Sequence, residues 1–107
     1  MLLNDKIAIV TGAGSGIGAA SAKRFATEGA AVVVADVRGL KAEAVAEEIR
    51  SAGGHAVARE VDVSLADDVE ALVEGCVAEF GGLDVLFNNA GTLRPGSAVD
   101  LSVEDWD

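Results

Sequence analysis

The sequence predicts an α/β fold in which helices cover both faces of a parallel sheet. Four short apolar runs alternate with three helical patterns, an order typical of βαβ units with right-handed crossovers. The first two runs are continuously apolar, as expected for parallel strands buried on both faces. The length of 107 residues allows one domain that can still bury a core.

The first predicted strand, Ile7–Val10, leads into the glycine-rich stretch Thr11–Gly18. An alanine-rich helix, Ile17–Glu28, follows, and Gly29 is expected to end it. Glycines let backbone N–H groups close around an anion, and a helix N-terminus adds unpaired N–H groups and partial positive charge. A strand before the glycines and a helix after them is the context that a dinucleotide-binding fingerprint requires. We therefore expect a Rossmann-like sheet of strand order 3-2-1-4, with the ligand crevice between strands 1 and 4.

The second predicted strand is Ala31–Ala35, and the third is Ala56–Val61. The helix between them is expected from about Leu40 to Ala52. Its expected buried face is formed by three residues: Val45, Ile49 and Ala52.

The third helix has the clearest apolar stripe, at i, i+3, i+4, i+7, i+8 and i+11. The stripe comprises Val69, Leu72, Val73, Cys76, Val77 and Phe80. Ser64 is placed as its N-cap with Asp67 three residues later, and Gly81 is expected to end the helix. The fourth strand is expected at Val85–Phe87, and a further helix is expected to start near Ser102.

The charge balance argues against some partners. Eighteen acidic and eight basic residues give a net charge of −10, which disfavours nucleic acid and anionic membrane surfaces. The one cysteine, Cys76, suits a reducing cytosol and is expected to pack in the core. No metal site is predicted, because His55 is the only histidine and is expected in a surface turn. With neither a signal peptide nor a membrane-spanning run in the sequence, we expect a soluble cytoplasmic protein.

Asp36 ends the second predicted strand, where an acid can accept hydrogen bonds from the hydroxyls of an adenosine ribose. Its carboxylate would also repel a 2′-phosphate. A basic residue before Gly16 or directly after Asp36 would favour such a phosphate, but these two positions hold Ser15 and Val37. We therefore predict NAD as the cofactor, with NADP as the alternative because Arg38 is close. The alternative interpretation of Asp36 is a simple turn residue.

Three motifs, in register along the whole chain, resemble those of the short-chain dehydrogenase/reductase family. The first is Thr11-Gly12-X-X-X-Gly16-Ile17-Gly18, which matches the family's cofactor signature. The second is Asp62-Val63 after the third strand, and the third is Asn88-Asn89-Ala90-Gly91 after the fourth. Without the other motifs, this last stretch would be taken for a polar turn that ends a strand.

The resemblance implies a role for each matching position. Gly12, Gly16 and Gly18 would form the turn, while Ser15 and Ile17 would lie against the phosphate and nicotinamide halves of the cofactor. Asp62 would bond the adenine amino group and Val63 would pack on the ring. The residues Asn89, Ala90 and Gly91 would border the ribose on the nicotinamide side, with Asn88 bracing the sheet.

The family's catalytic residues are not matched. Its members transfer hydride between the nicotinamide and an alcohol or carbonyl substrate, with a Tyr as acid/base, a Lys four residues later, a Ser and an Asn. This sequence has no tyrosine. We therefore expect residues 1–107 to be a single, partial dinucleotide-binding domain that ends before the later strands. This chain alone would be inactive, and it would belong to a longer, homo-oligomeric dehydrogenase. The alternatives are a non-catalytic nucleotide-binding or interaction module and, with less support from the glycine spacing, a methyltransferase.

Overall fold

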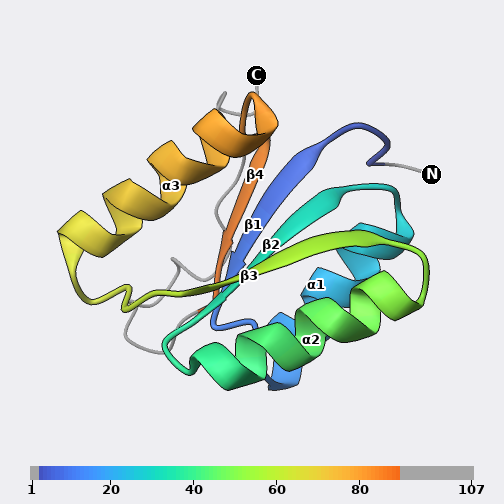
Figure 1. The fold of residues 1–107 in the computed structure, drawn as a ribbon, viewed down its shortest axis with the longest axis horizontal. Coiled ribbons are helices and arrows are strands. Elements are labelled where there is room, and N and C mark those ends of the chain that lie inside the picture. The colour runs from blue at the N-terminus through green and yellow to red at the C-terminus, as the bar shows by residue number, and fades with distance from the viewer. Residues whose placement is uncertain (1–2, 90–107) are drawn as a thin grey trace.

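A four-stranded parallel sheet forms the centre of the molecule (Figure 1). The computed structural model describes residues 3–89. Its strands are β1 (Ile7–Thr11), β2 (Ala31–Asp36), β3 (His55–Glu60) and β4 (Val85–Asn88). The helices between them are α1 (Gly16–Thr27), α2 (Gly39–Ser51) and α3 (Ala66–Phe80). The observed order, β3-β2-β1-β4, confirms the predicted fold and strand order.

The helices lie in two layers, one on each face of the sheet. Helices α1 and α2 cover one face and α3 lies over the other (Figure 1). Successive residues of β1 point to opposite faces, so that Ala8 and Val10 pack toward α1 and α2 while Ile9 packs toward α3. This two-sided burial explains why the runs Ile7–Val10 and Ala31–Ala35 are apolar throughout.

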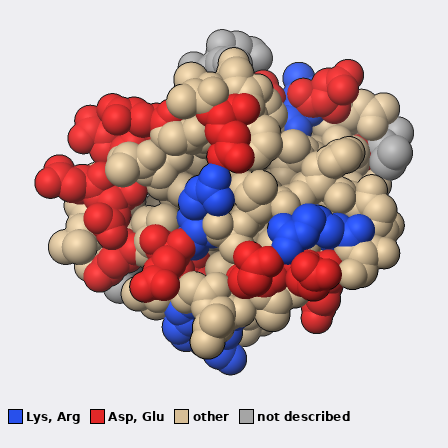
Figure 2. All heavy atoms as spheres, in the orientation of Figure 1, with Lys and Arg blue, Asp and Glu red and all other residues tan. Residues whose placement is uncertain are grey.

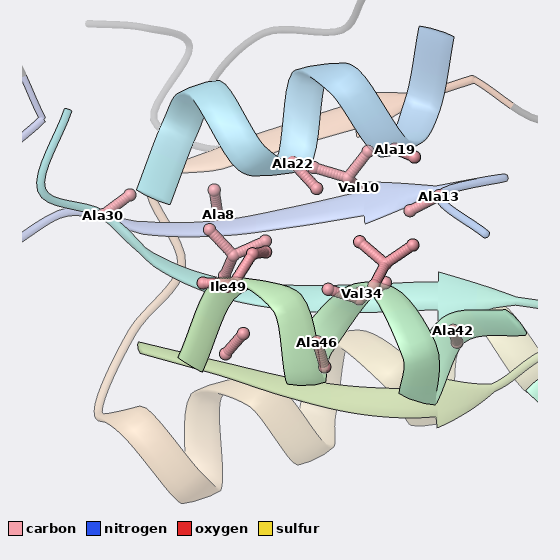
Figure 3. Packing of buried hydrophobic residues seen from close by; sticks show 13 residues of the cluster. Ala8, Val10, Ala13, Ala19, Ala22, Ala30, Val34, Ala42, Ala46 and Ile49 are labelled. Carbon is pink, nitrogen blue, oxygen red and sulfur yellow. The ribbon is translucent and has the colours of Figure 1, made fainter. Parts of the chain in front are cut away.

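The layer beneath α1 and α2 is built largely from alanine (Figure 3). Small side chains on both helices let their backbones approach the sheet closely. The buried alanines of this layer are Ala8, Ala13, Ala19, Ala22, Ala30, Ala42, Ala46 and Ala56. The larger side chains of Val45 and Ile49 fill the space beneath α2 as predicted, whereas Ala52 follows the helix and is exposed.

The predicted N-cap of α3 is wrong. The helix begins at Ala66, and Leu65 occupies the cap position without a side-chain hydrogen bond. Ser64 instead donates its hydroxyl to Asp62 Oδ1 at 2.6 Å and its backbone N–H to the same oxygen at 3.0 Å. The Ser64 hydroxyl is therefore bonded to the nearby carboxylate in a local turn and does not cap the helix. Gly81 ends α3 in the left-handed conformation, as predicted.

The predicted apolar stripe of α3 is wider than the buried one. Leu72 and Cys76 are buried, but Val77 is 46% exposed. Within the described part of the chain α3 has no helix beside it on its face of the sheet, so only the line nearest the strands is covered. Acidic side chains gather on this side of the molecule (Figure 2).

Two further observations concern the part of the chain that is described. None of its helices is both long and apolar enough to cross a membrane. The helix expected to start near Ser102 lies outside residues 3–89.

Candidate cofactor-binding site

The candidate site lies where the carboxyl ends of the four parallel strands meet. The turn between β1 and α1 is held against the end of β2 by two backbone donors. Ala13 N donates to the carbonyl oxygen of Ala35 at 3.0 Å, and Gly14 N donates to Asp36 Oδ2 at 2.8 Å. The order of the strands places β2 and β4 on either side of β1, so this turn faces both neighbours.

The glycines of the turn take the conformations that the motif requires. Gly12 and Gly16 both have φ of 63°, in the left-handed region that side chains with a Cβ rarely adopt. Gly18 is in the first turn of α1, where a Cβ would collide with the carbonyl oxygen of Gly12 and approach Asn89 Nδ2. The structure thus brings Gly12, Gly18 and Asn89 into contact, although Asn89 is far away in the sequence.

The start of α1 offers both polar and apolar groups to a ligand. Ser15 is in the N-cap position with extended backbone, and its hydroxyl does not cap the helix. The N–H groups of the first turn of a helix have no partner within the helix and carry partial positive charge, which suits a phosphate. Ile17 is 71% exposed at the same place. A large apolar side chain left open beside a phosphate-type turn fits a ligand that covers it.

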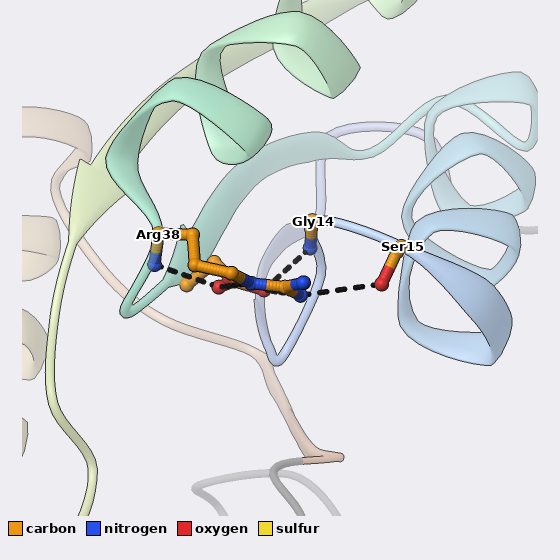
Figure 4. Close-up of polar contacts among 4 residues, drawn as sticks. Gly14, Ser15 and Arg38 are labelled. Atoms are coloured by element: carbon orange, nitrogen blue, oxygen red, sulfur yellow. Dashed lines mark hydrogen bonds and ion pairs between the residues drawn. The ribbon is translucent and has the colours of Figure 1, made fainter.

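Asp36 is buried at the end of β2, with 4% of its surface exposed. Its carboxylate accepts hydrogen bonds from the backbone N–H of Gly14 at 2.8 Å and of Arg38 at 2.8 Å. The side chain of Arg38 adds two more, from Nε at 2.9 Å and from Nη2 at 3.1 Å (Figure 4). Burial raises the pKa of Asp36, but the hydrogen bonds from Arg38 and Gly14 outweigh it and hold the pKa below its usual range. The residue is therefore a fixed, ionised acceptor and more than a turn residue.

Arg38 has a role that the sequence did not reveal. Its Nη2 also donates to Ser15 Oγ at 3.2 Å, so the guanidinium joins the end of β2 to the start of α1 (Figure 4). The sequence signal was the Asp-X-Arg spacing, which suits an arginine that folds back on an acid two residues earlier.

Asp62 and Val63 follow β3, on the side of the sheet away from β4. Asp62 Oδ1 accepts from the hydroxyl and from the N–H of Ser64, and these bonds lower the pKa of Asp62. Val63 is half-buried and packs against the apolar cluster beneath α3. These two residues thus lie beside the end of β3, at the edge of the sheet where β2 ends in Asp36.

Thr11 ties the end of β4 to the end of β1, which the sequence did not predict. It is 2% exposed, donates its hydroxyl to Asn88 Oδ1 at 2.7 Å and accepts from the N–H of Asn89 at 3.0 Å. Asn88 therefore braces the sheet, in keeping with its expected role. The predicted site residues Ala90 and Gly91 lie outside the described residues.

Cys76 has the structural role expected of it, whereas His55 is exposed as predicted but lies in a strand instead of a turn. Cys76 is buried, and burial raises the pKa of its thiol, which makes it a core residue. His55 is the exposed first residue of β3. Among residues 3–89, no group of three or more potential ligands could hold a metal ion.

Comparisons with known proteins agree on one kind of relative. The family profile described as short chain dehydrogenase matches residues 6–107. A 2,5-dichloro-2,5-cyclohexadiene-1,4-diol dehydrogenase of Sphingobium indicum is 45% identical over 104 residues, which make up 97% of this chain and 42% of that protein. A cyclohexanol dehydrogenase of an Acinetobacter strain is 43% identical over 104 residues, or 96% of this chain and 41% of that protein.

A solved structure gives the same result in three dimensions. The crystal structure of a hydroxysteroid dehydrogenase from Escherichia coli aligns with a TM-score of 0.81 at 44% identity. The alignment covers 83% of this chain and 38% of that one. The chain spans about two fifths of the length of the curated relatives it matches.

Proposed function

The chain belongs to the short-chain dehydrogenase family, and from this premise we propose that residues 1–107 form the cofactor-binding part of an oxidoreductase. The whole protein would transfer hydride between NAD(H) and an alcohol or carbonyl substrate. The two relatives described above are named for a diol and an alcohol, which supports this substrate class. The bound nicotinamide supplies or accepts the hydride, and the residues described here hold and orient the cofactor.

The observation that carries this proposal is the position of the Asp36 carboxylate. Two backbone N–H groups, from Gly14 and Arg38, fix it at the mouth of the glycine-rich turn. An acid fixed in this way can accept hydrogen bonds from both hydroxyls of an adenosine ribose without losing its position. The turn and the start of α1 lie beside this carboxylate, which Gly14 contacts, and there they can hold the adjacent phosphates.

The other site residues would act around this centre. The turn of Gly12, Gly16 and Gly18 would carry the pyrophosphate, with Ser15 beside it. Ile17 is exposed and would be covered by the nicotinamide half. Asp62 would bond the adenine amino group and Val63 would pack on the adenine ring. The residues expected to border the ribose on the nicotinamide side are Asn89, Ala90 and Gly91.

We propose that the cofactor is NAD rather than NADP. A buried, ionised Asp36 would repel a 2′-phosphate at close range, while a ribose hydroxyl can donate to it. The two neighbouring positions at which a basic residue would favour that phosphate hold Ser15 and Val37.

An Asp36→Ala substitution tests this role. The 107-residue chain is titrated with NAD and NADP, and we expect NAD to bind at least about tenfold more tightly, because hydrogen bonds to a charged group contribute about 1.5 to 3 kcal/mol. Asp36→Ala should bring the ratio of the two affinities close to one. The matched control is Asp67→Ala, which removes the same charge from exposed α3 and should leave the ratio unchanged. An unchanged ratio in Asp36→Ala would refute the role of Asp36.

The proposal extends to turnover and to the whole protein. We propose that the 107-residue chain alone produces no NADH from cyclohexanol and NAD, because it has no tyrosine to serve as the acid/base of the family. The whole protein would be a cytoplasmic homo-oligomer. NADH absorbance above the background of a chain-free sample would refute the first of these statements.

A further inference from the structure

We propose that the Arg38 side chain covers the Asp36 carboxylate, which is the proposed ribose site, and that the adenosine ribose must displace this cover in order to bind. The inference rests on the proposed function, since it takes Asp36 as the acceptor of the ribose hydroxyls. It assigns Arg38 a new role as an affinity-determining residue that competes with the ligand.

The Asp36 carboxylate already accepts four hydrogen bonds, two at each oxygen. Each oxygen of the carboxylate takes one backbone N–H and at least one N–H of the Arg38 guanidinium. The carboxylate is thus fully engaged before any ligand arrives. Two ribose hydroxyls can be accepted only if some of these donors leave.

The donors to this carboxylate differ in their freedom to move away from it. The N–H groups of Gly14 and Arg38 belong to the main chain of two turns and are fixed by the fold. The guanidinium belongs to a long side chain that is 48% exposed, whereas the carboxylate beneath it is only 3% exposed. Arg38 therefore covers the acid from the solvent side and is the donor that can rotate away without disturbing the backbone.

Arg38 also joins the two groups that the nucleotide would contact. Its Nη2 reaches both Asp36 Oδ2, at 3.1 Å, and Ser15 Oγ, at 3.2 Å (Figure 4). These two partners are the proposed ribose acceptor and the proposed phosphate neighbour. A side chain that bridges them lies across the path by which a nucleotide would reach the carboxylate.

An equilibrium between covered and open states lowers the apparent affinity of the ligand. The observed dissociation constant equals the intrinsic constant divided by the open fraction. An open fraction of about one tenth corresponds to about 1.4 kcal/mol in favour of the covered state, somewhat more than a fully exposed ion pair contributes, because the carboxylate of this pair is buried. Removing the cover should therefore tighten ribose binding about tenfold.

The test uses adenosine, because an uncharged ligand removes the attraction between Arg38 and phosphate from the comparison. Adenosine and 2′,3′-dideoxyadenosine are titrated into the wild-type chain, Arg38→Ala and Lys41→Ala, with binding followed by NMR chemical shifts. Lys41 is a matched control, since it is a cation in the first turn of α2, three residues after Arg38, and has no bond to the Asp36 carboxylate in the described part of the chain. We expect Arg38→Ala to bind adenosine about tenfold more tightly than wild type. The affinity for dideoxyadenosine, which cannot donate to Asp36, should stay the same, and Lys41→Ala should match wild type.

Each outcome decides between the two proposals. If wild type binds adenosine and Arg38→Ala binds it equally or more weakly, Arg38 is a fixed part of the site and the cover is refuted, while the proposed function stands. An equal gain for both nucleosides would also refute the cover, because the gain would not depend on the hydroxyls. If neither wild type nor Arg38→Ala binds NAD or adenosine, the proposed function falls and the cover falls with it.

A measurement on the unmodified chain does not depend on how well a variant folds. The Nε–H resonance of Arg38 is followed by NMR during the adenosine titration. We expect it to move, at saturation, to the position of an arginine Nε–H that bonds only to water. A resonance that stays in place while the backbone signals of the site saturate would show that Arg38 keeps its bonds to Asp36 and would overturn the inference.

Discussion

The same substitution, glycine to alanine, should have opposite effects at two helical positions of this chain. Gly18 is in the first turn of α1, where a Cβ would collide with the carbonyl oxygen of Gly12 and lie 2.8 Å from Asn89 Nδ2. Gly75 is in α3, where a Cβ would meet nothing within 4 Å. The first obstacle is backbone, which cannot rotate aside as the end of a flexible side chain can.

The structure sets the size of each effect. Alanine is favoured over glycine inside a helix by roughly 0.5 to 1 kcal/mol, so Gly75→Ala should raise the free energy of unfolding by about that amount. Gly18→Ala has the same helical gain but forces the turn and α1 apart, and overpacking of this kind costs about 1 to 3 kcal/mol. We therefore expect Gly18→Ala to be the less stable variant by roughly 1 to 3 kcal/mol.

Urea denaturation followed by circular dichroism measures the difference directly. With a slope of about 1 to 1.5 kcal/mol per molar urea, the midpoints of the two variants should differ by about 0.7 to 3 M, with wild type between them. A Gly18→Ala variant as stable as wild type would refute the close approach of α1 to the turn. A loss of stability in Gly75→Ala would show that this part of α3 is not open.

Two further predictions concern polar groups of the site. Thr11→Val should lower the free energy of unfolding by about 1 to 3 kcal/mol, because Asn88 Oδ1 and the N–H of Asn89 lose their partner. Thr11→Ser keeps the hydroxyl and should lower it less, as measured by urea denaturation of both variants. Equal costs for the two variants would show that the hydroxyl contributes nothing. Asp36 has a lowered pKa, so its contribution to stability should be complete above about pH 4 and be lost as the pH falls through the lowered value. The stability of Asp36→Asn should therefore fall less steeply with acid than that of wild type, and parallel acid curves would contradict the pairing with Arg38.

The positions of most elements followed from local patterns. The runs at β1 and β2 matched the observed strands to within one residue, because continuous burial on both faces leaves a continuous apolar signature. The ends of α1 and α3 were also readable, since Gly29 and Gly81 adopt positive φ where the helical pattern stops. The site turn was recognisable for the same reason: its glycines are local requirements of the backbone.

The sequence patterns did not predict which groups some side chains would bond to or pack against. Ser64 has the residue type and position expected of an N-cap, yet it bonds Asp62. Its hydroxyl and its backbone N–H both donate to one oxygen of that carboxylate, two residues away in the chain. Val77 has the spacing of a core residue, yet it is 46% exposed, because burial depends on what lies beside α3. Neither outcome is encoded in the residues' own spacing.

The sequence by itself determined the order of strands and helices, the phosphate-type turn and the family to which the chain belongs. Only the tertiary structure decided that Arg38 folds over Asp36 to reach Ser15 and that Thr11 holds the end of β4. The physical reason is the distance along the chain between the residues that determine each feature. Backbone conformation and apolar periodicity are set by neighbours within a few residues, whereas the partner of a buried polar group is set by the register of strands that are distant in the chain.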